Sequence, residues 1–262
     1  MAATKREREQ ARKRQEKWER RQAQVRARRR RVFALVAVVA VVALFGGTLV
    51  VSGVAGGLGG AADPTPTPAA ADCPTASTQA RSGGKLPDPA AAEDRSWTAT
   101  VQLCTGSGES DLVVELDGAA APQAVASFVS LADQGYFDGT GCHRLTTSGI
   151  YVLQCGDPTG TGTGGPGYSY GPIENAPEDD VYPAGTIAMA RVGGDGASMG
   201  SQFFVVYEDS TIPSDAAGGY TVLGTVTSGL DAVQAVADAG VAGGAGDGAP
   251  ASPVIIEGVE TQ

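Results

Sequence analysis

The chain has 262 residues and a mass of 26.3 kDa, and its 42% hydrophobic and 18% charged residues exclude a fully disordered protein. Its net charge of −10 is unevenly divided, since residues 1–31 carry 14 Lys and Arg against 4 Asp and Glu, whereas the other 231 residues carry 5 against 25. The acidic part argues against nucleic-acid binding by a folded domain, because a phosphate backbone requires a basic face. A single histidine excludes a His-rich metal site.

Residues 1–31 are dominated by Lys, Arg, Glu and Gln, all of which favour helix. No regular apolar stripe accompanies them, so a helix here would have little to bury. We expect a basic cytoplasmic segment that is solvated or lies at a membrane surface. A nucleic-acid-binding arm is the alternative.

Twenty residues without a charge follow, from 32 to 51, and they are rich in Val, Ala and Leu. At ~1.5 Å per residue they span a bilayer core of ~30 Å. We therefore predict a single transmembrane helix over residues 32–52. The arginine cluster at 28–31 places the N-terminus in the cytoplasm and the rest of the chain outside. A cleaved signal peptide is the alternative, although its apolar stretch is usually only ~7–15 residues.

Residues 53–94 are rich in Gly, Ala, Pro, Ser and Thr, with Pro64, Pro66 and Pro68 in the middle. Proline-rich spacers are extended and semi-rigid. We predict a linker over 53–94 that separates a folded domain, residues 95–262, from the membrane.

The domain is predicted to contain short strands joined by glycine-rich turns, with two helices between them. The predicted strands cover residues 97–103, 111–116, 142–146, 151–155, 186–190, 202–207, 220–226 and 254–259. A turn is predicted at 105–110, and helices over 122–134 and 230–239. This order favours a mainly β protein, a closed antiparallel barrel with helical caps.

All four cysteines follow the apolar segment, in the compartment that permits disulfides. Three pairings are possible. Cys142 and Cys155 lie on two candidate strands and are placed to face each other, which would leave Cys73 to pair with Cys104. Four free thiols are the alternative, and the spacing is not that of a zinc site.

Two further motifs match known patterns only in part. Residues 196–200 fit the G-x-S-x-G nucleophile elbow around Ser198, but a strand follows where the elbow needs a helix. A hydrolase of that class also needs a histidine after the serine, whereas His143 precedes it. Residues 157–167 are rich in Gly and Thr but lack the Gly-Lys-Ser/Thr ending of a phosphate-binding loop. We expect a surface loop there.

Five other runs form a consistent set. They are Cys-His-Arg-Leu at 142–145, Val-Leu-Gln-Cys-Gly-Asp at 152–157, Ile-Ala-Met-Ala at 187–190, Gly-Ser-Gln-Phe-Phe-Val at 200–205 and Val-Leu-Gly-Thr-Val at 222–226. Together they resemble the cyclophilin family, in the family's order and with near-family spacing. The resemblance covers roughly residues 96–260, and the whole chain is most similar to the membrane-anchored members of actinobacteria.

The resemblance implies an eight-stranded antiparallel closed β-barrel capped by two α-helices, here preceded by a single transmembrane helix. It implies peptidyl-prolyl cis-trans isomerase activity without a metal or cofactor. Its partners would be proline-containing segments of secreted or envelope proteins, and the catalytic domain would be monomeric. Residues 32–52 would bind the membrane, and no nucleic acid is implied. A non-catalytic peptide-binding or scaffold module is the alternative.

The resemblance also implies the site. Arg144 matches the family's catalytic arginine, Gln154 the glutamine that orients substrate and arginine, and Phe204 the aromatic floor of the proline pocket. Further substrate-binding positions are implied for Tyr151, Val152, Ala190, Gln202, Ile212 and Tyr220. For Arg144 the alternative is a surface ion pair. For Phe204 it is a core position, which we expect instead for Phe203.

The chain departs from the commonest family members in three ways. Two extra residues lie between Arg144 and Gln154, and two more between Ala190 and Gly200. Tyr220 stands where many members have a pocket histidine. The tryptophan that many members place near Ile212 is absent, which predicts weak binding of cyclosporin.

Overall fold

The computed structural model describes residues 73–262. The predicted basic segment 1–31 and transmembrane helix 32–52 lie outside this range. Within residues 73–262, no helix has the length and apolar character needed to cross a bilayer.

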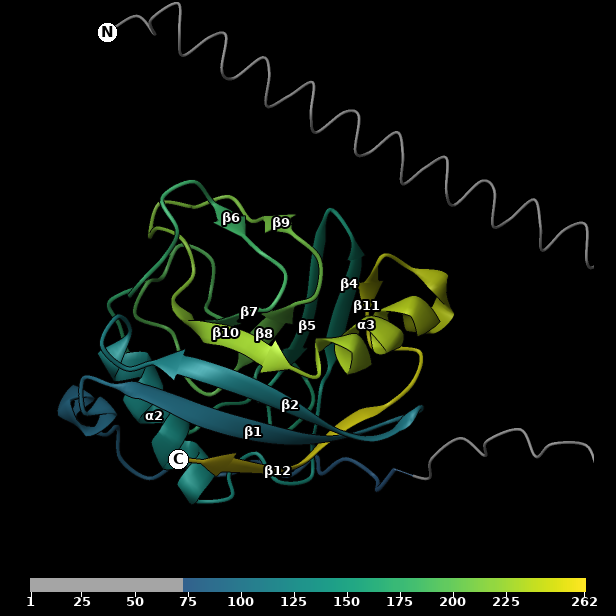
Figure 1. Cartoon of the computed structure of the whole chain (residues 1–262), viewed down its shortest axis with the longest axis horizontal. Helices are drawn as coiled ribbons and strands as arrows, with labels where there is room; N and C mark the ends of the chain where they lie inside the picture. Colours follow the sequence, from purple (N-terminus) through teal and green to yellow (C-terminus); the bar gives the residue numbers. More distant parts are fainter. Residues whose placement is uncertain (1–72) are drawn as a thin grey trace, which may run out of the picture. The chain divides into compact units, whose positions relative to one another are not determined.

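Eight strands of four or more residues and two α-helices dominate the described part of the chain (Figure 1). The eight strands are β1 (Ser96–Thr105), β2 (Gly108–Asp117), β4 (Arg144–Ser148), β5 (Ile150–Cys155), β7 (Thr186–Met189), β8 (Phe203–Val206), β10 (Val222–Ser228) and β12 (Val254–Thr261). Strands of two residues are β3 (Thr140–Gly141), β6 (Val181–Tyr182), β9 (Ser210–Thr211) and β11 (Asp247–Gly248). The helices are α2 (Pro122–Asp133) and α3 (Leu230–Ala239), with short 3₁₀ turns η1 (Pro89–Ala92) and η2 (Ala242–Gly244). Each strand and helix predicted within residues 95–262 is present, with ends shifted by up to a few residues.

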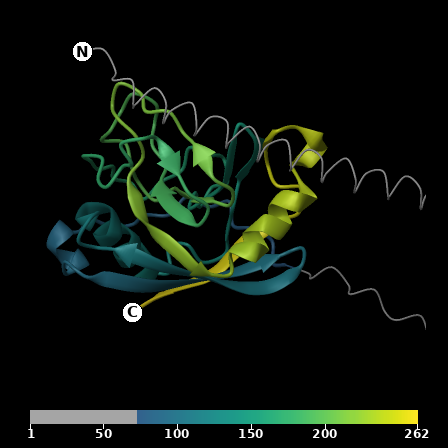
Figure 2. The ribbon, with the colours of Figure 1, turned by 45° about the horizontal axis from the view of Figure 1, so that its top comes forward.

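Ten strands form one antiparallel sheet in the order β11-β4-β5-β8-β7-β10-β2-β1-β12-β3, and β6 pairs with β9 separately. The two end strands, β3 and β11, do not pair with each other. The predicted eight-stranded closed barrel is therefore corrected to a ten-stranded sheet that curls into a half-barrel (Figure 2). The hydrogen-bonded pairing of strands stops where the chain passes from β3 to β4. Cys142 N–H donates to the carbonyl of Val254 in β12, whereas His143 N–H donates to the carbonyl of Gln154 in β5.

Two of the shifted strand ends have a clear cause, because backbone groups there bond to other partners. Cys142 bonds to β12, so β4 begins only at Arg144. The N–H of Tyr220 donates to the hydroxyl of Tyr182 at 2.8 Å, so β10 begins at Val222.

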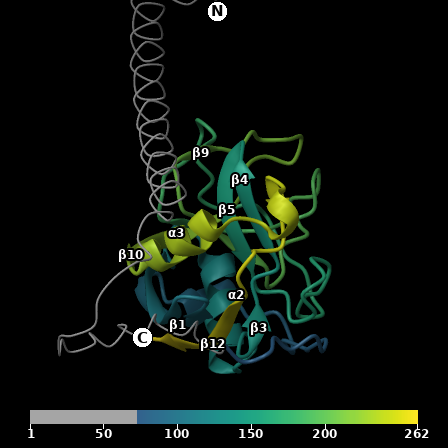
Figure 3. The ribbon, with the colours of Figure 1, turned by 90° about the vertical axis from the view of Figure 1, so that its right-hand side faces the viewer.

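The helices lie at opposite ends of the sheet, α2 near η1 and α3 beside β11 (Figures 1 and 3). Pro122 occupies the first turn of α2, where a missing N–H costs nothing. The next two N–H groups, those of Gln123 and Ala124, donate to the carboxylate of Glu174, each at 3.0 Å. A distant side chain thus provides the cap that Ala121 lacks.

The main core fills the concave side of the sheet under α2 and α3. Alternation along each strand decides which side chains enter it, because successive residues point to opposite faces. Leu153, Phe203, Val205, Ile187 and Met189 are buried in this core. Residues that alternate with them along β5, β7 and β8 face the other way and form a second, smaller cluster with Tyr182 of β6 and Ile212, which follows β9. The strand residues of this cluster are Val152, Ala188, Phe204 and Val206.

Residues 73–94 belong to the domain rather than to the predicted linker over 53–94. Cys73 is disulfide-bonded to Cys104 of β1. Arg81 donates to the carbonyls of Gly135 and Tyr136, and Gly83 N–H donates to Pro166. These contacts bring the domain's start forward to at least Cys73.

Both disulfides have the predicted pairing. Cys142 bonds to Cys155, and no cysteine among the described residues is free. The Cys142–Cys155 bond joins the segment before Arg144 to the residue after Gln154.

Candidate active site

Three of the predicted residues stand in one row across adjacent strands. The register places Arg144 of β4 opposite Gln154 of β5, and Gln154 opposite Phe204 of β8. Phe204 in turn faces Ala188 of β7. Directly opposed residues share a face of the sheet, so the three side chains lie together on the side away from the main core.

A cavity of about 160 Å³ opens beside this row. Phe204 forms part of its wall and is only 5% exposed. The ring of Tyr220 meets Phe204 edge to face, with 5.5 Å between the ring centres. The cavity is lined by Arg144, Ile150, Val152, Gln154, Ala190, Arg191, Phe204, Ile212 and Tyr220. It is thus small, with apolar side chains beside the polar groups of Arg144, Gln154 and Arg191, a combination found in specific ligand sites.

Hydrogen bonds link the polar edge of the cavity into a chain. Arg144 Nη1 donates to Gln154 Oε1 at 3.4 Å, and Gln154 Nε2 donates to Gln202 Oε1 at 2.9 Å. Gln202 Nε2 donates to the carbonyls of Gly162 and Gly164, at 3.0 and 2.8 Å. The two glutamine amides are therefore oriented by their neighbours rather than free to rotate.

Arg144 also forms a surface ion pair, which was the alternative to a catalytic role in the sequence analysis. Its Nε and Nη2 donate to Asp247 Oδ1 and Oδ2, at 2.8 and 2.7 Å. The hydrogen bonding with Asp247 raises the pKa of Arg144 above its usual range and lowers that of Asp247. Arg144 is therefore both ion-paired and part of the cavity wall.

A larger cavity of about 360 Å³ adjoins the first and shares Gln154, Ala190 and Arg191 with it. Loop residues 162–166, predicted only as a surface loop, form one of its walls. The fully buried carboxylate of Asp157 organises this loop, accepting hydrogen bonds from the backbone N–H groups of Thr159, Gly162 and Gly164. These and the Thr159 hydroxyl outweigh burial and lower the pKa of Asp157.

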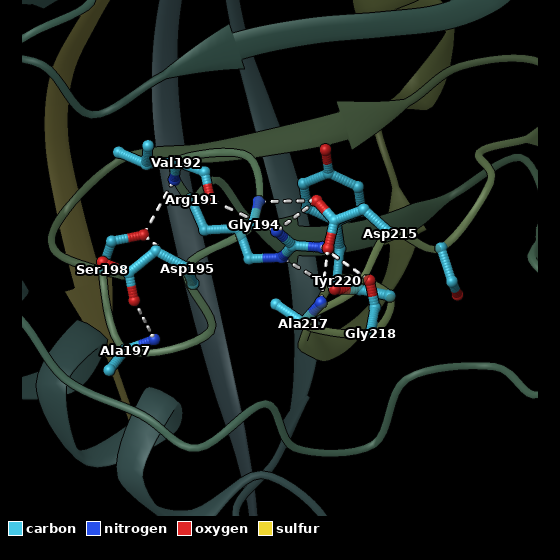
Figure 4. Close-up of polar contacts among 12 residues, drawn as sticks. Arg191, Val192, Gly194, Asp195, Ala197, Ser198, Asp215, Ala217, Gly218 and Tyr220 are labelled. Carbon is cyan, nitrogen blue, oxygen red and sulfur yellow. Dashed lines mark hydrogen bonds and ion pairs between the residues drawn. The ribbon is translucent and has the colours of Figure 1, made fainter.

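Arg191 was not predicted as a site residue, yet it lines both cavities. Figure 4 shows its guanidinium between two loops, next to Asp215 and in front of the ring of Tyr220. The guanidinium carbon lies 4.7 Å from the centre of that ring. Arg191 could have been singled out from the sequence as a candidate site residue, because it is one of only five Lys and Arg residues after residue 31.

His143 lies beside Arg144 with its ring half-buried, and neither ring nitrogen has a hydrogen-bond partner among the described residues. Burial is the main cause of a lowered pKa, which Arg144 lowers further and Asp157 partly offsets. The neutral ring is therefore favoured near pH 7.

The structure sorts the other predicted substrate-binding residues into three groups. Val152, Ala190, Ile212 and Tyr220 line the smaller cavity. Gln202 lines the larger one. Tyr151 lines neither, because it alternates with Val152 along β5 and packs against the main core instead, with its ring 6.0 Å from that of Tyr207. Ile150 occupies the cavity wall that we predicted for Tyr151.

Ser198, at the centre of the nucleophile-elbow match, has no catalytic partner within the described part of the chain. Its hydroxyl donates to the carbonyl of Asp195 and accepts from Val192 N–H, within one turn. The match is therefore a turn motif.

A curled antiparallel sheet that presents an arginine, a glutamine and a phenylalanine in one row beside a small cavity defines the class of protein that the sequence runs resemble. The chain belongs to the cyclophilin family: the model for "Cyclophilin type peptidyl-prolyl cis-trans isomerase/CLD" matches residues 100–261.

Known relatives agree with this assignment. The chain is 46% identical over 189 residues to the probable peptidyl-prolyl cis-trans isomerase B of Mycobacterium tuberculosis, covering 67% of this chain and 56% of that protein. The chain thus spans little more than half the length of that relative. Identity to peptidyl-prolyl cis-trans isomerase B of Bacillus subtilis is 44% over 117 residues, covering 45% of this chain and 76% of that protein. A crystal structure of a cyclophilin-type isomerase from Cryptosporidium parvum superposes with a TM-score of 0.52 at 26% identity, covering 64% of this chain and 98% of that one.

Proposed function

We propose that this protein is a peptidyl-prolyl cis-trans isomerase that accelerates rotation about X-Pro bonds. The observation that carries the proposal is the row of Arg144, Gln154 and Phe204 beside one small cavity. Its relatives are named as isomerases, and one related crystal structure was determined in the presence of the dipeptide Ala-Pro.

The reaction requires no bond to be broken. The two X-Pro isomers differ by about 0.5–1 kcal/mol but interconvert over tens to hundreds of seconds. The barrier, about 20 kcal/mol, arises because twisting the amide removes its resonance. A catalyst therefore needs to stabilise the twisted amide, and neither a nucleophile nor a proton transfer is required.

We assign the stabilisation of that state to Arg144. In the twisted amide the prolyl nitrogen becomes pyramidal and gains a lone pair, which accepts a hydrogen bond from a guanidinium. Such a contact is strong only in the transition state and thus lowers the barrier. Phe204 and the surrounding apolar wall receive the proline ring, and Gln154 holds the peptide backbone beside Arg144.

The contact between Arg144 and Asp247 supports a second candidate function. Because the carboxylate occupies two of the three guanidinium nitrogens, the arginine is less free to meet a peptide. A non-catalytic peptide-binding or scaffold module has the same cavity without the acceleration.

The two functions are separated by cis-trans exchange in a short Ala-Pro peptide, measured by NMR exchange spectroscopy with the full chain in mild detergent. We expect fast exchange in the wild type and a 10²–10³-fold loss in Arg144→Ala, the cost of one preorganised donor. Arg95→Ala is the control, since the Arg95 side chain is as exposed as that of Arg144, at 41%, and also pairs with a carboxylate. Peptide binding without acceleration by the wild type favours the scaffold.

We further propose that residues 32–52 anchor the protein in the cell membrane with the domain outside and the N-terminus in the cytoplasm. Two disulfides in the domain support an oxidising compartment. The basic charge of residues 1–31 supports the orientation. Clients would then be secreted or envelope proteins. Protease added to intact cells should remove the domain while sparing the N-terminal segment. Protection of the domain would contradict the orientation.

A further inference from the structure

We propose that Asp247 is the positioning residue for Arg144, holding the guanidinium in the orientation in which its remaining donors face the peptide. The inference rests on the proposed isomerase function and deepens it. Asp247 lies 103 residues after Arg144 in the chain and stood in no predicted motif.

The contact between Arg144 and Asp247 is bidentate and fixes the plane of the guanidinium. Arg144 Nε and Nη2 each donate to a separate oxygen of the Asp247 carboxylate, at 2.8 and 2.7 Å. Charge-assisted bonds of this paired geometry are stronger and more directional than single ones. The remaining nitrogen, Nη1, points toward Gln154 Oε1 at 3.4 Å and therefore toward the cavity that both residues line.

Asp247 is itself held against the strand that carries Arg144. Strand β11 pairs with β4, placing Asp247 opposite Thr146 and Gly248 opposite Leu145. Just before it, the Gly246 carbonyl accepts a hydrogen bond from Thr147 N–H at 2.8 Å. The carboxylate and the guanidinium thus extend from neighbouring strands with a common register.

The segment that carries Asp247 is closed on itself. Ala242 N–H donates to Ala249, and Ala251 N–H donates to Gly240, both at 2.8 Å. Val241 also bridges Pro250. These bonds hold the loop between α3 and β12, so Asp247 is a fixed acceptor rather than a mobile surface carboxylate.

Without Asp247, the described residues would offer the guanidinium a single 3.4 Å contact, the one with Gln154. A free arginine side chain has many rotamers, and ordering it again in the transition state costs conformational entropy. This entropy limits the resulting loss of rate to about 30-fold. Inhibition would have the opposite effect, because removing a carboxylate that competes with the peptide for the donors of Arg144 would raise kcat. The direction of the change in kcat therefore decides between positioning and inhibition.

The test uses the full chain in detergent and compares the wild type, Asp247→Asn, Asp247→Ala and the control Asp238→Asn. Asp247→Asn is nearly isosteric, so it should fold. Asp238 is exposed on α3, and its side chain makes no hydrogen bond with the described residues. We expect kcat for Ala-Pro exchange to fall about 5- to 30-fold in both Asp247 variants, with KM unchanged, because the affected donor acts mainly in the transition state. Asp238→Asn should match the wild type.

A spectroscopic measurement distinguishes positioning from a general structural effect. The Nε–H resonance of Arg144 should shift and exchange faster with water in both Asp247 variants. That of Arg191, which donates to the Gly219 carbonyl at 2.9 Å, should not move. Unchanged or raised kcat in folded Asp247 variants would overturn the inference, as would an unchanged Arg144 resonance. An inactive wild type would instead contradict the proposed function, and the inference would fall with it.

Discussion

Arg191 and Asp215 form a bidentate ion pair in which the arginine side chain is fully buried and the aspartate is 37% exposed. Nη1 and Nη2 of Arg191 donate to the two carboxylate oxygens at 2.9 and 3.0 Å (Figure 4). Asp215 also accepts from the backbone N–H groups of Gly194 and Ala217, each at 2.8 Å. The pair therefore joins the loop after β7 to the loop before β10, beside the Tyr220 ring.

We predict that Arg191→Met lowers both stability and substrate affinity. The carbonyls of Gly218 and Gly219 lose their charged donor, and a hydrogen bond to a charged group contributes about 1.5–3 kcal/mol. Tyr220 also loses the cation beside its ring, which loosens one wall of the smaller cavity.

Thermal unfolding and peptide exchange kinetics check this expectation. Arg191→Met should show a lower Tm and a raised KM, whereas Arg95→Met, at an exposed ion pair, should change Tm much less. Equal changes in Tm for the two substitutions would show that the burial of Arg191 does not add to the stability of the domain.

The histidine provides a pH prediction. His143 is the one histidine of the chain, and burial lowers its pKa below the usual 6.5. Between the folded pKa and 6.5 the unfolded chain binds more protons than the folded one, so the free energy of unfolding decreases as pH falls through this window. The stability that the folded protein gains from the neutral His143 ring is fully present above pH 6.5.

The single imidazole makes the measurement direct. Its ring resonance should titrate with a pKa below 6.5, and His143→Gln should remove that residue's share of the stability loss between pH 7 and 5.5. A pKa at or above 6.5 would mean that Asp157, the charge that favours protonation, dominates over burial.

The two disulfides should differ in their effect on activity. Their cysteines are 13 and 31 residues apart, and closing a loop of about 15 residues stabilises by roughly 3 kcal/mol. Replacing either pair by serine should therefore lower stability by a similar amount. Only the Cys142–Cys155 pair flanks Arg144 and Gln154, so only its loss should also lower kcat at a temperature where both variants are folded.

Each double variant serves as the control for the other. Exchange kinetics at 10 °C and urea unfolding would be measured on the same samples. Equal kcat in the two variants would show that β4 and β5 keep their register without the disulfide.

The site residues were predicted from the family resemblance rather than from periodicity. The structure places Phe203 in the core and Phe204 in the cavity wall, as that resemblance implies, because neighbours on a strand face opposite ways. Helix α3 covers the predicted residues, because its apolar spacing matches a helical period. The same alternation contradicts the placement of Tyr151 and Val152 in one pocket, since neighbours on a strand face opposite ways.

The remaining features depend on contacts between distant residues. Asp247 meets Arg144 only because β11 joins the edge of the sheet beside β4, and Arg191 meets Asp215 only because two loops converge over Tyr220. Periodicity and composition determine which face of a strand or helix is buried, and this much the chain specifies by itself. The pairing of one buried or edge charge with another is decided by sheet order and register, which arise only when the whole domain packs.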